Sequence, residues 1–438
     1  MKKLTVFWFR RDLRLKDNHG LFRALTEDGN VQPIFIFDSE ILSRLEDRND
    51  ARVSFLAETL QEMKVRLQKK GADLWIYRGS PVEIWKRLLN EHRVGAVYAN
   101  RDYEPEALTR DRAIQRLLEA RGIPFHLSKD QCLFETDEVL SGQGTPYTVF
   151  TPYKKKVLSV LTEKDLKPFR SEDQESSFNR TSATRMISLK DLGFEPSSLA
   201  FPERKILRSV ISGYPKTRDF PALSKGTSRL GLHLRFGTLS IRELARIARD
   251  LKADTYLSEL IWRDFFMQIL WHFPKVKKQS FREAFDRIKW RTSKTDFQRW
   301  CAGETGFPWV DAGMRELNET GFMHNRVRMA TASFLTKHLL IHWSEGERHF
   351  ARRLLDYDLS ANNGNWQWVA GTGCDAAPYF RVFNPDLQAK KFDPDGEYLR
   401  RWVPELGTSK YPKPMVDHDE ARGRALSEYS KVSKGKSP

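Results

Sequence analysis

The sequence has few of the patterns that mark secreted, metal-binding or membrane proteins. It contains only three cysteines, and Cys132, Cys301 and Cys374 are far apart along the chain. This spacing excludes a disulfide scaffold and a zinc module, and it is typical of a reducing compartment. No apolar run approaches the roughly 18 residues that a membrane helix needs. We therefore expect a cytoplasmic protein with no bound metal ion and no membrane contact.

The chain is strongly basic. It has 74 lysine and arginine residues against 58 aspartate and glutamate residues, which is a formal net charge of +16. A soluble protein with such an excess often binds a polyanion, most commonly nucleic acid, although the charge can also serve solubility alone. The 438 residues are 40% hydrophobic and 30% charged, as in ordinary globular proteins. At roughly 150 residues per domain, we expect two or three domains.

The first part of the chain alternates short apolar runs with helical patterns. Strands are predicted at residues 4–9, 31–37, 74–77, 94–99 and 124–127, with amphipathic helical stretches between them. This alternation predicts a doubly wound parallel sheet. Neither a G-x-G-x-x-G motif nor a Walker A motif follows any of these strands, so the domain is not interpreted as a dinucleotide binder.

The rest of the chain changes character twice. Residues 131–200 are polar and irregular and are interpreted as a connector over the surface in which short helices can form, after an α/β domain at residues 1–130. Residues 201–438 read as helical almost throughout, and nine of the 12 tryptophans lie there. The fold class predicted is therefore α/β plus all-α.

Two helical stretches in the second half combine polar and aromatic residues on one face. Glu259, Trp262 and Arg263 are spaced at i, i+3 and i+4. They suit the wall of a site for a flat, polar, aromatic ligand, although a core tryptophan beside a surface ion pair has the same pattern. The segment 361–368, ANNGNWQW, makes a poor helix by itself but a suitable ligand-facing one.

With these residues the chain resembles the DNA photolyases and cryptochromes, most closely the class I photolyases that act on cyclobutane pyrimidine dimers. The resemblance runs nearly from end to end. It implies an N-terminal antenna domain, which holds a light-harvesting chromophore, and a helical domain that binds a U-shaped flavin adenine dinucleotide (FAD). The motifs that carry it are FRRDLR (9–14), DN (17–18), YEP (103–105), GTSRL (226–230), LRFGTLS (234–240), ELIWR (259–263), GFMHNRVRM (321–329), ANNGNWQW (361–368) and DAAPYFRVFNP (375–385).

The resemblance implies which residues hold FAD, whose active form is FADH−. Residues 227–230 match contacts on the phosphate side, where a helix start suits a diphosphate. Asp356 and Asp358 match acids beside the isoalloxazine and ribityl groups, and Arg328 would pair with Asp356. Asn362 matches the residue that faces flavin N5, and an amide there is typical of repair enzymes. The implied cofactor-binding residues are Tyr214, Thr227, Ser228, Arg229, Leu230, Gly231, Asn325, Arg328, Asp356, Tyr357, Asp358 and Asn362.

The resemblance also implies a light-driven reaction on DNA. An electron passes from the excited cofactor to a dimer flipped out of the duplex, the cyclobutane ring splits, and the electron returns. Trp366, Trp343 and Trp290 match the chain of indoles that photoreduces the flavin in several short electron-transfer steps. The implied catalytic residues are these three tryptophans with Glu259 and Asn362. The implied substrate and DNA contacts are Arg218, Glu259, Trp262, Arg263, Asn325, Arg326, Met329, Trp368 and Gln388.

Several alternatives stay open at this point. The chain could be a blue-light receptor, or a photolyase for (6-4) photoproducts, although that branch uses paired histidines and the segment 321–329 has only His324. A second, light-harvesting chromophore is also open. Of the positions that contact folate in folate-binding members of the family, only Lys278 matches, so folate is disfavoured. A deazaflavin, another flavin or no second chromophore are the open alternatives. We expect a monomer that needs no protein partner and joins the nucleoid when it binds damaged DNA.

Overall fold

The computed structural model describes residues 3–433. Contacts between residues divide the chain into two compact units. Unit 1 comprises the chain up to Glu138 together with Val160–Lys205 and Leu230–Ile247, and unit 2 comprises Val139–Ser159, Ile206–Arg229 and Ala248–Pro438. The predicted connector is therefore shared between the two units. The domain boundaries at residues 130 and 200 stay predictions.

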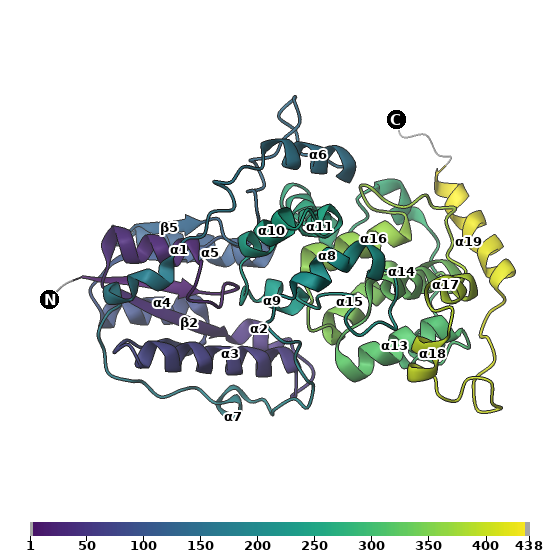
Figure 1. Cartoon of the computed structure of the whole chain (residues 1–438), viewed down its shortest axis with the longest axis horizontal. Coiled ribbons are helices and arrows are strands. Elements are labelled where there is room, and N and C mark those ends of the chain that lie inside the picture. The colour runs from purple at the N-terminus through teal and green to yellow at the C-terminus, as the bar shows by residue number, and fades with distance from the viewer. Residues whose placement is uncertain (1–2, 434–438) are drawn as a thin grey trace. The chain divides into compact units, whose positions relative to one another are not determined.

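Unit 1 is built on a parallel five-stranded sheet in the order β3-β2-β1-β4-β5 (Figure 1). All six residues of β1 are buried, as expected for a central strand of a sheet covered on both faces. The helices α4 (Pro81–Glu91) and α5 (Pro105–Glu119) pack on the sheet in one core cluster, with Trp85 against Trp8. The predicted doubly wound α/β fold is confirmed. The strands are β1 (Leu4–Phe9), β2 (Val31–Asp38), β3 (Trp75–Gly79), β4 (Val94–Asn100) and β5 (Phe125–Ser128).

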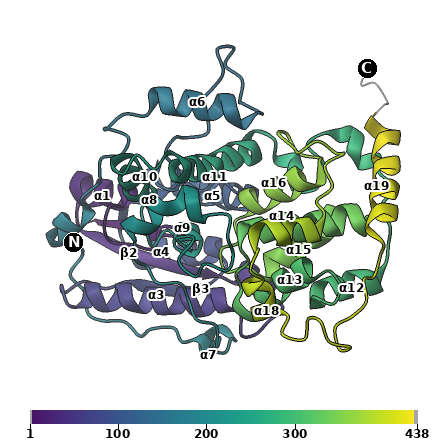
Figure 2. The same ribbon diagram turned by 45° about the vertical axis from the view of Figure 1, so that its right-hand side comes forward.

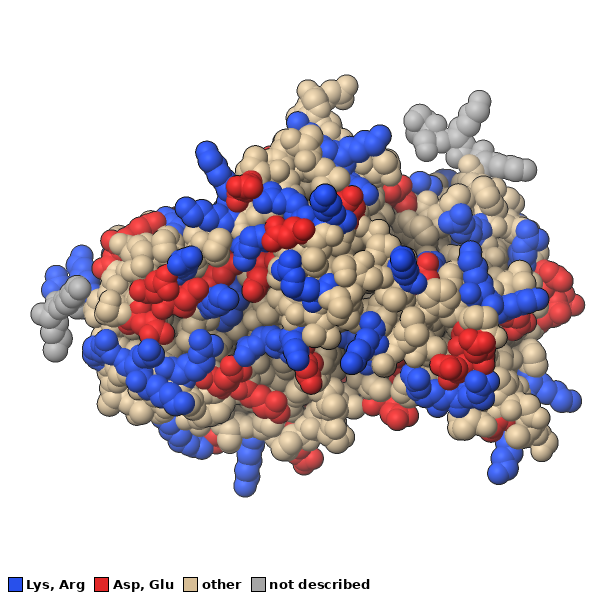
Figure 3. Space-filling view, viewed as in Figure 1, with Lys and Arg blue, Asp and Glu red and all other residues tan. Residues whose placement is uncertain are grey.

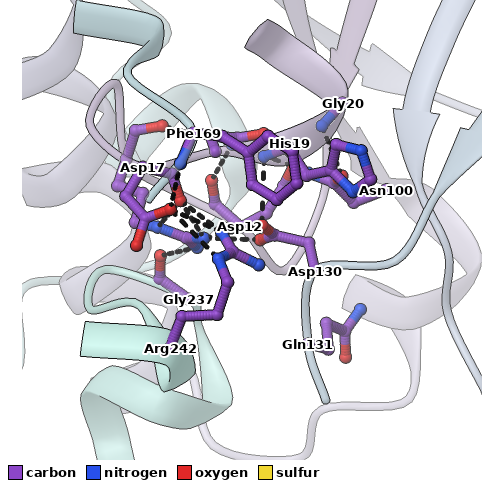
Figure 4. A network of polar contacts seen from close by, with 12 residues as sticks. Asp12, Asp17, His19, Gly20, Asn100, Asp130, Gln131, Phe169, Gly237 and Arg242 are labelled. Atoms are coloured by element: carbon purple, nitrogen blue, oxygen red, sulfur yellow. Dashed lines mark hydrogen bonds and ion pairs between the residues drawn. The ribbon is translucent and has the colours of Figure 1, made fainter. Parts of the chain in front are cut away.

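A network of buried ion pairs joins distant segments of unit 1 (Figure 4). The Arg14 guanidinium contacts the Asp130 carboxylate at 2.7 Å, and Arg242 contacts both Asp17 and Asp130 at 2.8 Å. All four side chains are at most 7% exposed. Burial raises the pKa of Asp130, but the two arginines outweigh this effect and the pKa is lowered. The network ties α10 (Ile241–Asp250) to the loop after β1 and to the end of β5.

Unit 2 is helical, as the sequence predicted. Helices α14, α15 and α16 lie side by side (Figures 1 and 2), and α11 also packs on α16. Close approach of helices depends on glycine: a Cβ on Gly364 of α16 would lie 2.1 Å from the Phe266 ring of α11. None of the described helices has the length and apolar character to cross a membrane. The main helices are α6 (Phe150–Val160), α8 (Arg208–Thr217), α11 (Asp254–His272), α12 (Lys294–Ala302), α13 (Pro308–Thr320), α14 (Asn325–Ser333), α15 (Trp343–Arg353), α16 (Leu359–Ala370), α17 (Pro385–Phe392), α18 (Glu397–Trp402) and α19 (His418–Ser433).

The buried network predicts a large stability effect of one carboxylate. Asp130→Ala should lower the free energy of unfolding by about 3–5 kcal/mol, because Arg14 and Arg242 would then be buried without their shared partner. Glu83→Ala, which removes a 67% exposed carboxylate paired with Lys86, is the control and should change it by less than about 0.5 kcal/mol. Urea unfolding followed by circular dichroism measures both. Equal, small effects of the two variants would contradict the assigned role of the network.

Candidate functional site

Helix α11 presents the three residues that the sequence analysis put on one face, and each has a partner in unit 2. Glu259 forms an ion pair with Arg218 at 2.5 Å, and its side chain is 34% exposed. Trp262 is half-buried and stacks on Phe150, with ring centroids 3.5 Å apart and an angle of 8° between the planes. Arg263 lies 3.7 Å from Asp264. The face is therefore neither a plain core face nor an isolated surface ion pair.

Charged residues from three segments meet around Arg218. Arg218 lies over the Tyr214 ring at 5.1 Å and 3.8 Å from Asp219, which also pairs with Arg326. Burial, with the nearby Glu259 carboxylate as a second cause, raises the pKa of Tyr214, so this phenol stays protonated. The structure thus brings together Tyr214, Arg218, Glu259 and Arg326, which the sequence analysis assigned to cofactor and DNA contacts.

A second charged group lies around Phe322. Arg328 forms the ion pair with Asp356 that the sequence analysis predicted, at 2.9 Å, and its Nε donates to the Met323 carbonyl at 2.6 Å. Arg229, whose φ of +51° is rare for a residue with a side chain, lies over the Phe322 ring at 4.4 Å. Arg328 lies 5.8 Å from the same ring. Both arginines also interact with the buried Glu316 carboxyl group, whose pKa is raised by burial. The two guanidinium groups are suitable partners for an anionic ligand.

Helix α16 begins at a carboxylate and places an amide one turn later. The Asp358 carboxylate caps the helix by accepting from the backbone N–H groups of Ser360 and Ala361, at 3.1 and 3.3 Å. Asn362 follows, and its Nδ2 donates to Oε1 and to the backbone carbonyl of Glu347, at 2.8 and 3.1 Å. The Oδ1 atom of Asn362 therefore remains to accept a hydrogen bond from a ligand.

Glu347 is a site residue that the sequence analysis missed. It comes from α15, and burial raises the pKa of its carboxyl group although the Asn362 amide opposes this. Its position four residues after Trp343 puts both on one face of α15, and this spacing was the available signal. Glu347 fixes the orientation of the Asn362 amide.

The three tryptophans of the predicted electron-transfer chain belong to one hydrophobic cluster. Trp366 and Trp343 are buried and Trp290 is half-buried. Their role in electron transfer stays a prediction. His342 lies against both Trp343 and Trp290, at ring-centroid distances of 5.3 and 5.2 Å. Gly346 lets Trp366 approach α15, because a Cβ there would lie 2.1 Å from the Trp366 ring.

The other predicted residues are more scattered. Ser228 shares a hydrogen bond of 3.0 Å with the Tyr256 hydroxyl, and Thr227, Tyr357, Trp368 and Gln388 are half-buried. Asn325 is exposed at the start of α14, with its Nδ2 3.9 Å from the Met329 sulfur. Leu230 and Gly231 belong to unit 1, so their predicted contact with a ligand of unit 2 stays a prediction.

Comparisons with known proteins agree for both halves of the chain. Residues 5–172 match the family described as DNA photolyase, and residues 256–410 match the FAD binding domain of DNA photolyase. A deoxyribodipyrimidine photo-lyase of Alkalihalophilus pseudofirmus is 37% identical, over 97% of each chain. A class III photolyase from Agrobacterium tumefaciens is 34% identical with a TM-score of 0.88, over 99% of this chain and 98% of that one. An archaeal photolyase from Sulfolobus tokodaii, which contains two FAD molecules, is 35% identical with a TM-score of 0.86, over 98% of this chain and 100% of that one.

The packing of Trp366 on α15 predicts the effect of a single methyl group. Gly346→Ala should destabilise the protein by about 1–3 kcal/mol, because the new Cβ overlaps the Trp366 indole and the surrounding side chains are packed too closely to move aside. Gly423→Ala in α19 is the matched control: it meets nothing within 4 Å and should stabilise by about 0.5–1 kcal/mol. Thermal unfolding compares the two. A neutral Gly346→Ala variant would contradict the close approach of the two helices.

Proposed function

The chain belongs to the DNA photolyase family, and on this premise we propose that it repairs cyclobutane pyrimidine dimers in DNA with light, using FAD bound by unit 2. The observation that carries the proposal is the Asn362 amide held by Glu347, with Oδ1 left to accept a hydrogen bond. An acceptor oriented in this way suits the protonated N5 of a reduced flavin. Its neighbours on α16 are Asp358 and Trp366, at the spacing of one helical turn.

The residues of unit 2 fit FAD. The hydroxyl groups of Thr227 and Ser228 and the guanidinium group of Arg229 are suitable partners for a diphosphate, and Asp356, Asp358 and Asn362 offer acceptors for a flavin and its ribityl chain. The guanidinium groups of Arg229 and Arg328 beside Phe322 are suitable partners for an anionic reduced cofactor. When bound as FADH−, the cofactor supplies the electron that opens the dimer and takes it back.

The protein's own residues position the lesion. We assign Trp262 and Trp368 to the two sides of a dimer that has left the base stack, and Glu259 to a hydrogen bond with it. Arg218 forms an ion pair with the Glu259 carboxylate and fixes its orientation. Arg218, Arg263, Arg326 and Gln388 are assigned to the DNA backbone, with Asn325 and Met329 beside the lesion. Trp366, Trp343 and Trp290 connect the interior to the surface for photoreduction.

One observation favours cyclobutane dimers over (6-4) photoproducts. The branch for (6-4) photoproducts uses paired histidines near the lesion, and the segment 321–329 has only His324. Burial first, and then Arg328 and Arg326, lower its pKa to about 4, and its Nδ1 accepts from the backbone N–H of Arg326 as the cap of α14. The His324 ring is therefore neutral at ordinary pH, and its Nδ1 is used as the helix cap.

The remaining assignments extend the proposal. A second chromophore is proposed as a flavin rather than a folate, because the Sulfolobus tokodaii relative contains two FAD molecules and only Lys278 matches the folate contacts. We also propose that the protein is a monomer, that it needs no protein partner, and that it acts on the DNA of the nucleoid.

Repair of defined lesions tests the proposal directly. Duplexes with one cyclobutane dimer or one (6-4) photoproduct are bound, illuminated with blue light and assayed for restored pyrimidines. We expect repair of the dimer only. Glu259→Ala should lower the yield per absorbed photon at least about threefold, because a charge-assisted hydrogen bond stabilises by about 1.5–3 kcal/mol, while the FAD absorbance is retained. Glu319→Ala, at an exposed position of α13, is the control. No dimer repair by the unmodified protein would refute the function, and full yield from Glu259→Ala would refute the role of that residue.

Photoreduction tests the chain of tryptophans separately. Trp343→Phe should slow the light-driven bleaching of oxidised FAD in the presence of an external reductant, because phenylalanine is far harder to oxidise than an indole. Trp402→Phe, which changes a half-buried tryptophan of α18, is the matched control and should bleach at the normal rate. Equal bleaching of the two variants would show that electrons take another route.

A further inference from the structure

Helix α6, which the sequence analysis put in the connector, is docked on α11 beside Trp262. Its first residue, Phe150, is 7% exposed and stacks on the Trp262 indole at 3.5 Å. Tyr153 and Val157 are also buried and lie on the same face as Phe150, at i+3 and i+7. Phe150 and Tyr153 both contact the Phe265 ring, at 5.8 and 5.4 Å. The apolar face of α6 is therefore a packed interface with α11.

Polar contacts hold the start of α6 in place from two further segments. The Asp375 carboxylate accepts from the Phe150 backbone N–H at 3.0 Å, which caps the helix from the segment that follows α16. The buried Gln268 side chain of α11 donates to the Tyr147 carbonyl at 2.6 Å. Helix α6 is therefore fastened to α11, which carries Trp262, and to the segment that directly follows α16, the helix that carries Trp368.

Helix α6 carries three consecutive lysines: Lys154 lies at the edge of the buried face, and Lys155 and Lys156 lie away from it. Lys155 and Lys156 are exposed and Lys154 is half-buried, and α6 has no acidic residue. Within residues 3–433, no ion pair or hydrogen bond joins any of these three side chains to another residue. Figure 3 shows some lysine and arginine side chains among other residues in this region of the surface. At 1.5 Å of rise per residue, the lysines lie about 6–9 Å along the helix from the ring that stacks on Trp262.

We propose that α6 is a DNA-binding element, in which Lys154, Lys155 and Lys156 bind backbone phosphates next to the extruded dimer. This inference rests on the proposed function, because the lesion-flanking role of Trp262 sets where the DNA lies. Phosphates of one strand follow one another at about 3.4 Å along the axis, so a helix of this length spans several of them. Lysines that form no ion pair within the protein can bind phosphates and release counterions from the DNA without first breaking an ion pair. Phosphate contacts carry no sequence information, as a repair enzyme acting at any sequence requires.

The salt dependence of DNA binding tests the inference. The triple variant Lys154→Gln, Lys155→Gln, Lys156→Gln removes the charges but keeps side-chain length and helix propensity. The control triple variant Lys294→Gln, Lys410→Gln, Lys413→Gln removes the same charge from exposed positions of unit 2, on α12 and in the segment between α18 and α19. Affinities for undamaged duplex and for the same duplex with one cyclobutane dimer are measured over a series of salt concentrations.

We expect the α6 variant to bind both duplexes more weakly and its plot of log affinity against log salt to be less steep by about 2–3, since each lost phosphate contact contributes about 0.9. The control variant should keep the slope of the unmodified protein. An unchanged slope of the α6 variant, with normal dimer binding and repair by the unmodified protein, would overturn the inference and leave the proposed function intact. Failure of the unmodified protein to bind or repair the dimer would overturn both.

A second variant tests the coupling to Trp262. Phe150→Leu keeps an apolar side chain at the interface but removes the ring that stacks on the indole. The ratio of dimer-duplex to undamaged-duplex affinity should fall, because the indole loses its fixed position, while the salt slope stays normal. A normal ratio with a normal slope would show that α6 binds DNA without positioning Trp262, and it would overturn that part of the inference.

Discussion

The structure depends on the pairing of charged side chains that are buried inside the protein. In unit 1, Arg14, Asp17, Asp130 and Arg242 have almost no exposed surface and satisfy one another. Removing a partner weakens the pairing of a charge that is buried in a medium of low dielectric constant, which is strongly destabilising. Arg242 belongs to the segment 230–247, and Asp17 is also bonded through its backbone N–H to Glu172 of the segment 160–205. Both segments that border residues 206–229 are thereby held by the unit that contains the sheet.

The consequence for function is that residues 206–229 form a loop with anchored ends. The chain leaves unit 1 at residue 206 and returns to it at residue 230. This stretch carries Tyr214, Arg218 and residues 227–229. Anchored ends lower the conformational entropy that such a loop has to lose when it orders. The positive φ of Arg229 is the kind of strained conformation that persists only where the surroundings hold it in place. Binding residues are commonly found on loops that a rigid scaffold supports in this way.

Within unit 2, one helix organises most of the proposed chemistry. Asp358, Asn362 and Trp366 are spaced four residues apart, so α16 presents a carboxylate, an amide and an indole along one stripe. Each is held by a different contact: Asp358 by the cap it forms, Asn362 by Glu347, and Trp366 by the close approach to Gly346. Glycines at the two helix crossings bring α11 and α15 near enough to α16 for these contacts. Packing and chemistry are therefore set by the same few positions.

The sequence by itself determined the elements and their class. Apolar runs of strand length that alternate with helical stripes predicted all five strands of the sheet, and motif residues pointed to the helices that carry Glu259, Arg328 and Asn362. The tertiary structure decided which segments meet. Separate segments are joined by the Glu347 contact with Asn362, by the contact of His342 with Trp290, and by the stacking of Phe150 on Trp262. Periodicity records which face of an element is buried, but not what buries it, because the partner is chosen by packing of the whole chain. For that reason a polar stretch interpreted as a connector contains a helix docked beside the proposed lesion site.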